Sequence, residues 1–139
     1  MAGLTQYFQK ALLDHVLGIA TFTLPNPLYL SLHTADPTDT GSHTNEIGAG
    51  LGYSRQSLSA KMGATDSASG ISTNTSTITF GPASSAWGAI TYFGIEDGPS
   101  GGSPDLNHMM LDGAASASRT INTGGSYVLT AGQLSVQFD

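Results

Sequence analysis

The chain has 139 residues, no cysteine and a net charge of −6 from ten acidic and four basic residues. This length suits one domain with one hydrophobic core. The lack of cysteine excludes a disulfide framework, a cysteine nucleophile and a cysteine-rich zinc site. A nucleic-acid surface needs clustered lysine and arginine, whereas the basic residues here are scattered: Lys10, Arg55, Lys61 and Arg119. We therefore expect no direct binding of DNA or RNA.

Apolar residues recur at every fourth position near the start of the chain: Leu4, Phe8, Leu12 and Val16. This spacing predicts an amphipathic helix over residues 4–17. Gly18 suits the end of the helix because glycine adopts the left-handed conformation at low cost. The apolar stripe either packs on its own domain or docks on a neighbouring subunit, and we take these four residues as the candidate subunit contact.

From Leu28 onward the apolar period becomes two, which is typical of half-buried strands. The first expected strand, 28–33, leads into a turn at 36–39 and a long surface loop over 36–52. Further strands are expected over 53–60, around Ile71, and over 76–80, 89–96, 109–115, 118–121, 127–129 and 134–138. This pattern predicts an all-β fold, a β-sandwich of the jelly-roll type with one short N-terminal amphipathic helix. We expect the helix, residues 1–20, to be part of the same unit as a single β-sandwich domain, residues 21–139.

Membrane insertion is not expected, because no apolar run approaches the roughly 20 residues of a membrane span. The start of the chain also lacks the basic region followed by an apolar stretch that marks a signal peptide.

The histidines offer no recognisable metal motif, since no pair has the i, i+4 spacing that places two ligands on one helix face. We interpret His15 as a partly buried, hydrogen-bonded residue beside the helical stripe. The strand alternation places His33 on the solvent face.

The positions of the acidic residues also indicate structural roles. Asp36, Asp39 and Glu46 lie in one loop and are either calcium ligands or solvated turn residues; we favour the latter because their spacing does not match an EF-hand. Glu96 and Asp97 are adjacent at a strand end, where neighbours point to opposite faces, so we treat them as turn residues rather than an acid/base pair. The sequence predicts no metal and no cofactor.

The sequence gives little support for an enzymatic motif. Ser84 and Ser85 do not lie in a Gly-x-Ser-x-Gly elbow, and the segment 98–102, which has the letters Gly-Pro-Ser-Gly-Gly, follows a turn and opens no helix, whereas the elbow joins a strand to a helix. There is no Walker loop or dinucleotide fingerprint. We predict that the protein is not an enzyme. We interpret the single tryptophan, Trp87, as a core or rim aromatic that anchors the sheet; the alternative is a sugar-stacking residue of a glycan-binding module.

Several segments resemble a family of small virion proteins of tailed bacteriophages, commonly labelled phage tail or tail-fibre proteins. They are LSLHTADPTD at 30–39, YSRQ at 53–56, ITF at 78–80, WGAITYFGI at 87–95, GAAS at 113–116 and GQLSV at 132–136. The resemblance covers nearly the whole chain and implies a virion protein, assembled in the host cytoplasm, with no catalytic residues. The polar insertion at 103–107 departs from the pattern, where a tighter turn is expected.

The size of the chain bears on its place in the particle. A single domain of 14.2 kDa suits a capsid decoration or cement protein better than a long, repetitive receptor fibre. We therefore predict a structural protein that stabilises the capsid by subunit contacts, acting as a homo-oligomer with the major capsid protein or tail proteins as partners. The first alternative is a tail or tail-fibre component, followed by a glycan-binding module and an unrecognised hydrolase.

Overall fold

The computed structural model of the protein describes residues 3–100 and 108–138. The predicted insertion at 103–107 lies outside the described residues. Within them the chain forms one helix, α1 (Gln6–Val16), and nine strands. The strands are β1 (Gly3–Leu4), β2 (Tyr29–His33), β3 (Gln56–Ser57), β4 (Ile71–Thr73), β5 (Ile78–Phe80), β6 (Gly88–Glu96), β7 (Met109–Ile121), β8 (Tyr127–Leu129) and β9 (Ser135–Gln137). The expected all-β sandwich with a short N-terminal helix is confirmed.

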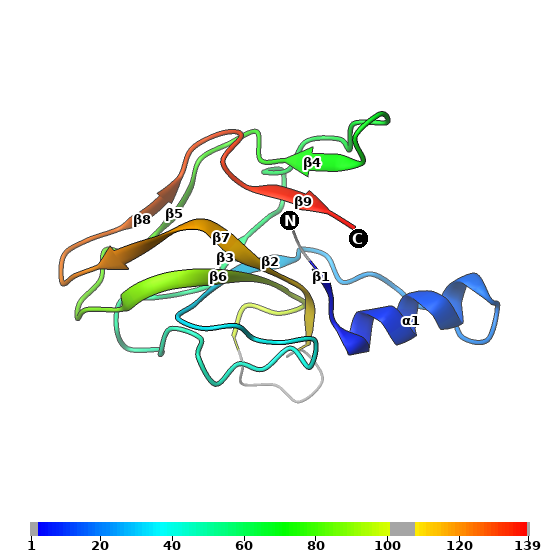
Figure 1. Ribbon diagram of the computed structural model, residues 1–139, viewed down its shortest axis with the longest axis horizontal. Coiled ribbons are helices and arrows are strands. Elements are labelled where there is room, and N and C mark those ends of the chain that lie inside the picture. The colour runs from blue at the N-terminus through cyan, green and yellow to red at the C-terminus, as the bar shows by residue number, and fades with distance from the viewer. Residues whose placement is uncertain (1–2, 101–107, 139) are drawn as a thin grey trace.

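The strands form one large antiparallel sheet and two small ones. The large sheet has the order β1-β7-β6-β2-β3, and the small ones pair β4 with β9 and β5 with β8. The two small pairs lie over one face of the large sheet, while the segment between β2 and β3 runs along the opposite face (Figure 1). Paired strands therefore cover one face of the large sheet, and a long segment with little regular secondary structure covers the other.

The core lies between the large sheet and the two strand pairs. The side chains of Leu30 and Leu32 on β2, Ile78 and Phe80 on β5, and Ile90 on β6 are fully buried there. Alternation along β2 sends Ser31 and His33 to the opposite face, and both are also fully buried. That face is thus an interior surface too, although its side chains are polar.

A large bulge interrupts the pairing of β6 with β7. Tyr92 pairs with Ala114 and Ile90 with Arg119, so one β6 residue lies opposite residues 115–118 of β7. A bulge of this kind bends a strand and increases its twist. It coincides with the gap between the two strands predicted over 109–115 and 118–121, which the structure joins into the single strand β7.

The helix begins two residues later than predicted. Thr5 is the N-cap: its side chain accepts a hydrogen bond from the Phe8 N–H and donates one to the Met109 carbonyl. Leu4 therefore belongs to β1, paired with Leu111. Gly18 follows the C-cap with a φ of 72°, as predicted for the residue that ends the helix.

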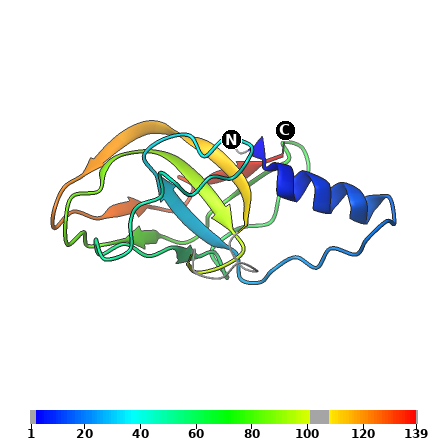
Figure 2. The same cartoon turned by 90° about the horizontal axis from the view of Figure 1, so that it is seen from below.

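The C-terminal part of α1 and the segment that follows it form an arm, residues 11–24, that extends away from the sheets (Figure 2). No helix within the described ranges has the length and apolar character needed to cross a membrane.

The strand expected over 53–60 is much shorter in the structure, where β3 contains only Gln56 and Ser57. The side chains of Tyr53 and Arg55 instead reach polar partners outside the ladder. Burial alternates only from Leu51 to Arg55, and strand pairing in this segment is confined to Gln56 and Ser57.

Substitutions at two neighbouring residues of β5 should differ sharply in their effect on the free energy of unfolding. Phe80→Ala should lower the free energy of unfolding by about 3–5 kcal/mol, because it leaves a cavity in a fully buried site. Thr79→Ala, on the exposed face of the same strand, should change it by less than about 0.5 kcal/mol. Urea denaturation of the two variants would check this, and equal losses would contradict the assignment of the core.

Candidate functional site

The carboxylate of Glu96, at the end of β6, is fully buried beneath the segment that links β2 to β3. The Ser31 hydroxyl donates a hydrogen bond of 2.7 Å to its Oε1, and His43 Nε2 lies 2.8 Å from its Oε2. The Arg55 guanidinium is 3.7 Å from Oε2. Burial opposes ionisation, but the neighbouring His33 ring, the hydrogen bond from His43 and the Arg55 charge lower the pKa of Glu96 to about 2. Glu96 is therefore an ionised group in the protein interior.

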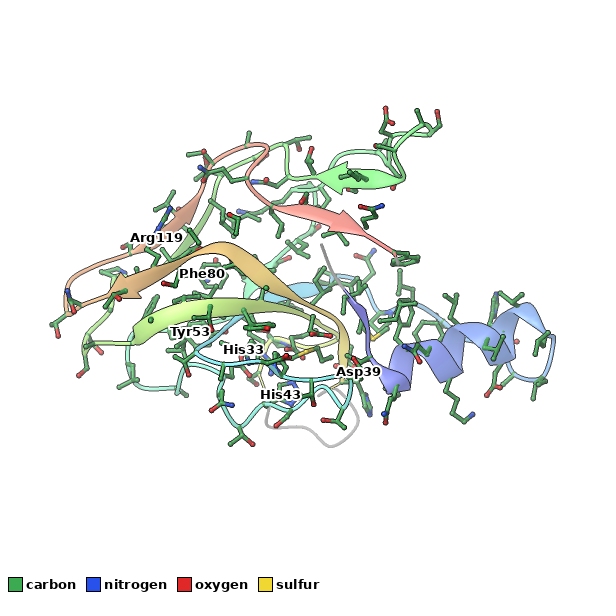
Figure 3. The ribbon with its side chains drawn as sticks, viewed as in Figure 1. His33, Asp39, His43, Tyr53, Phe80 and Arg119 are labelled. Atoms are coloured by element: carbon green, nitrogen blue, oxygen red, sulfur yellow. The ribbon has the colours of Figure 1, made fainter. Side chains whose placement is uncertain are left out.

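His33, on β2, is fully buried, and its tautomer follows from the hydrogen bonds around it. Its Nε2 lies 2.9 Å from the Ser31 hydroxyl oxygen. Since the single hydroxyl proton of Ser31 is donated to Glu96, His33 must donate its Nε2–H to Ser31. His33 and His43 lie close together on the polar side of the large sheet, with ring centroids 6.4 Å apart (Figure 3).

A second carboxylate, Glu46, binds Arg55 through both of its oxygens. Arg55 Nε lies 2.7 Å from Oε1 and Nη2 lies 2.7 Å from Oε2, which is the bidentate geometry of a strong ion pair. The Tyr53 hydroxyl donates a 3.0 Å hydrogen bond to Glu46 and accepts one from the Leu32 N–H. Burial and the Glu46 charge raise the pKa of Tyr53, which keeps the hydroxyl protonated as a donor.

We call this set of residues the Glu96 network: Ser31, His33, His43, Glu46, Tyr53, Arg55 and Glu96. Gly94 provides the space in which it forms. A Cβ at this position would lie 2.6 Å from Ser31 Oγ, 2.8 Å from Met109 Cε and 2.9 Å from Glu96 Oε1. Glycine inside a strand commonly marks such a close approach.

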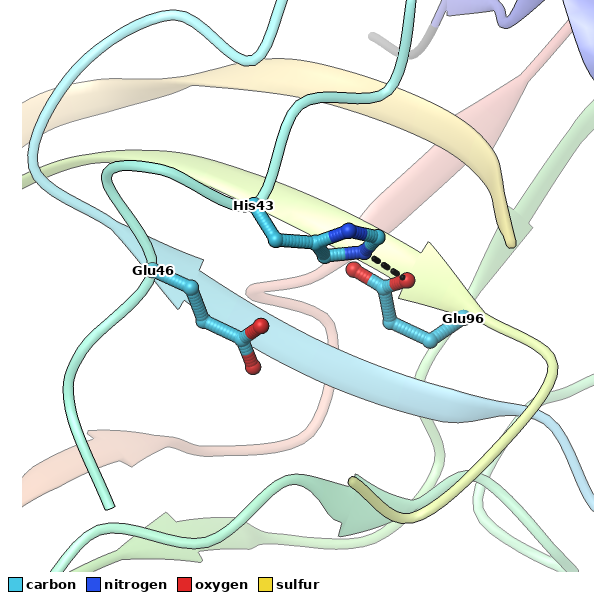
Figure 4. Close-up of side chains that lie close together, drawn as sticks. All are labelled: His43, Glu46 and Glu96. Atoms are coloured by element: carbon cyan, nitrogen blue, oxygen red, sulfur yellow. Dashed lines mark hydrogen bonds and ion pairs between the residues drawn. The ribbon is translucent and has the colours of Figure 1, made fainter. Parts of the chain in front are cut away.

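The ligand atoms of His43, Glu46 and Glu96 lie within 4.8 Å of one another, so their geometry would permit a metal ion (Figure 4). However, Arg55 already binds both oxygens of Glu46 and lies beside Glu96. A metal would have to displace this guanidinium and separate His43 from Glu96. The donor set therefore fits a protein-internal ion network better than a metal centre. The prediction of no metal and no cofactor stays a prediction.

A separate pair joins buried Asp97 to partly exposed His108 across the ends of β6 and β7. Asp97 Oδ2 lies 2.8 Å from His108 Nδ1, and Asp97 Oδ1 accepts a 2.8 Å hydrogen bond from the His108 N–H. The Tyr7 ring of α1 stacks on the His108 ring at 3.9 Å with an interplanar angle of 5°. This contact attaches the base of α1 to the large sheet.

The structure corrects several sequence interpretations. His33 is fully buried rather than solvent-facing, because the segment after β2 covers its face of the sheet. Glu96 and Asp97 are buried and bind His43 and His108, each at 2.8 Å, although Asp97 does lie in the bend that follows β6, as a turn residue would. Glu46 is not a solvated turn carboxylate, since it binds Arg55.

Other interpretations hold in whole or in part. Asp36 and Asp39 are exposed, and Asp36 caps its turn by accepting a hydrogen bond from the Thr38 N–H. His15 is hydrogen-bonded as predicted, through its Nδ1 to the Phe22 N–H, but it is exposed rather than partly buried. Trp87 is a buried anchor: its indole N–H donates a 2.7 Å hydrogen bond to the Leu51 carbonyl. Burial removes it as a sugar-stacking surface.

The four candidate contact residues have different environments. Phe8 is buried in the core, and Leu4 and Leu12 are partly buried against it. Val16 lies on the arm with 72% of its surface exposed. The sequence pattern thus identified the apolar stripe but not the point along it where the body of the protein ends. Contact with another subunit stays a prediction.

The sequence interpretation missed the Glu96 network because its members are spread over 66 positions of the chain, from Ser31 to Glu96. One signal was present: Gly94 interrupts an otherwise bulky strand, and glycine there indicates that another group approaches the backbone. Which groups approach it depends on the path of the segment between β2 and β3, which period-two alternation does not determine.

The Glu96 network predicts a pH-dependent stability. The hydrogen bond to Glu96 raises the pKa of His43, so its stabilisation is complete below the ordinary histidine pKa of 6.5 and is lost as pH rises through the raised value. The lowered pKa of Glu96 contributes stability that is complete above 4.5 and lost as pH falls toward 2. Together these two groups should stabilise the fold most between pH 4.5 and 6.5.

Urea denaturation of the native protein and of His43→Gln over this pH range isolates the histidine contribution. The difference in free energy of unfolding between them should be largest below pH 6.5 and should shrink at higher pH. Comparing the two proteins removes the contributions of the other titrating groups. Parallel pH curves would contradict a charged His43 in the folded state.

The space above Gly94 predicts a costly substitution. Gly94→Ala should lower the free energy of unfolding by about 1–3 kcal/mol, because the added methyl group displaces Ser31 or Glu96 from their hydrogen bond. Gly48→Ala is the matched control, since its nearest neighbour would be Leu51 Cδ1 at 3.8 Å. Thermal unfolding would measure both, and equal stability of the two variants would contradict the account.

The chain matches one known protein family over most of its length. The family model described as Podophage GP4 fiber I protein gp80 matches residues 3–137. A search of curated proteins gives no match. The family match confirms the resemblance to phage tail and tail-fibre proteins and identifies the protein as a virion component. Because the match spans nearly the whole chain, the protein belongs to the Podophage GP4 fiber I protein gp80 family of phage fibre proteins.

Proposed function

We propose that the protein is a non-enzymatic structural subunit of the tail-fibre region of a podophage particle. The observation that carries this proposal is the match of a fibre-protein family over residues 3–137. The internal chemistry agrees with a structural role, because the ionisable residues of the Glu96 network bind one another. Surface contacts with other virion proteins, rather than reactive groups, would then perform its function.

Capsid decoration is the other candidate. The small size of the chain favours it, since a 14.2 kDa domain repeated over a shell is an economical cement. The family match favours the fibre instead, and we therefore place the fibre first. A glycan-binding role through Trp87 has no support, because that side chain is buried.

Copy number separates the two candidates. A fibre component should occur in a few copies per particle, whereas a decoration protein should occur in tens to hundreds. Quantitative gel densitometry of purified virions, calibrated on the major capsid protein, would measure this, and gold-labelled antibody against the chain should mark the tail. An intense band and label over the whole shell would contradict the fibre assignment.

A further inference from the structure

The arm carries a cluster of apolar side chains that its own domain leaves uncovered. Leu13, Val16, Leu17 and Ile19 are exposed over 58%, 72%, 62% and 70% of their surfaces. Single exposed aliphatic residues are common on proteins, but four within seven positions form a patch. We call these four residues the arm tip.

The arm tip is held in one conformation by its own hydrogen bonds. The Gly18 and Ile19 N–H groups bind the His15 and Asp14 carbonyls at 3.2 and 2.8 Å. The Phe22 N–H donates to His15 Nδ1, which ties the returning chain to the helix. A surface that is already ordered loses little conformational entropy when it binds.

The same chain has a groove that, like the arm tip, is lined mainly by apolar side chains. It has a volume of about 650 Å³ and lies between the segment that returns from the arm and the end of the sandwich. Leu28, Leu58, Met62 and Val136 line it, with Leu24 and Pro25 at the returning segment. None of its lining residues is ionisable.

We propose that the arm tip of one copy docks in the groove of a second copy, and that the second copy returns its own arm tip to the first. Neither the arm tip nor the lining of the groove contains an ionisable residue, so the contact would bury no charge from either surface. From Ala11 to Leu24 the ionisable residues are Asp14, paired with Lys10, and His15, which binds the Phe22 N–H. The arm extends away from its own sheets in both views, so its tip lies apart from its own groove (Figures 1 and 2).

The surface area that the contact would bury favours a reciprocal exchange, in which each copy binds the arm tip of the other. A fully buried aliphatic side chain removes roughly 60–120 Å² from water, so four side chains about two-thirds exposed supply roughly 160–320 Å². Counting the groove as well, one tip in one groove buries roughly 300–650 Å², which is the size of a lattice contact. Two reciprocal contacts bury on the order of 1,000 Å², where specific interfaces begin. The inference deepens the proposed structural role, but purified protein tests it whatever its place on the particle.

Disulfide trapping tests the contact directly, because the chain has no cysteine of its own. Val16→Cys marks the arm tip, and Ser59→Cys marks an exposed position in the groove lining. Under mild oxidation, an equimolar mixture of the two variants should form a Val16–Ser59 cross-linked dimer as its main product. Ser85→Cys, an exposed serine outside the groove lining, replaces Ser59→Cys as the matched control and should cross-link poorly.

Three results would overturn the proposal. They are failure of the Val16→Cys and Ser59→Cys variants to cross-link above the Ser85→Cys control, dominance of dimers joined through position 16 of both copies, and an intramolecular disulfide in a variant that carries both Val16→Cys and Ser59→Cys. The last result would mean that the arm folds back on its own groove. Copy number in the virion does not bear on these outcomes, so failure here is distinct from failure of the fibre assignment.

Light scattering after size exclusion supplies a second readout. The native protein should have the mass of two chains, and Leu17→Asp should have the mass of one, with an unchanged melting temperature because Leu17 is exposed. Gln6→Asp adds the same charge at the exposed start of the same helix and should remain a dimer. A monomeric native protein, or a dimeric Leu17→Asp variant, would overturn the proposal.

Discussion

The buried charge of Glu96 is the constraint on which the polar half of the structure depends. Removing a carboxylate from water costs several kcal/mol unless hydrogen bonds and opposite charge compensate it. The compensating groups come from three separate segments: Ser31 and His33 on β2, His43 in the segment after it, and Arg55 before β3. Each segment must therefore take one position relative to β6, and the path of residues 34–55 follows from this requirement.

This arrangement gives the two faces of the large sheet different kinds of closure. One face packs apolar side chains such as Leu32 against those of the strand pairs, such as Phe80, and the hydrophobic effect that stabilises this contact is not directional. The other face is closed by hydrogen bonds and ion pairs whose geometry is specific. Paired buried charges contribute little net stability, but removing one partner is costly. The polar closure thus specifies one path for a long segment that has little regular secondary structure.

A structural role in the virion agrees with this organisation. The ionisable groups that would be candidates for catalysis are bound to one another, as His43 is to Glu96 and Glu46 is to Arg55. Within the described residues, the arm exposes several apolar side chains, and Val16 and Ile19 are largely exposed at its ordered end. Family membership, internal chemistry and exposed surface therefore all favour function by contact between proteins.

The sequence predicted local features well and the polar network poorly. The fourfold spacing from Leu4 to Val16 determined the helix, and Gly18 marked its end. Alternation determines which residues of β2 share a face but not what covers that face, so it places His33 in solvent although the side chain is buried. The local sequence indicates only a turn role for Glu96, because the partners that bind its carboxylate lie up to 65 positions away. Such long-range partners are determined by the tertiary path of the chain.

Hydrogen exchange in Glu96→Gln tests the central claim most directly, because this substitution keeps the shape of the side chain and removes its charge. The Thr34 and Ile47 amides bind Asn45 and Leu32 across the polar face, and they should lose protection. The amides that pair β5 with β8 on the apolar face should keep their protection. Unchanged protection of Thr34 and Ile47, or equal loss on both faces, would contradict the claim that the Glu96 charge holds the polar segment in place.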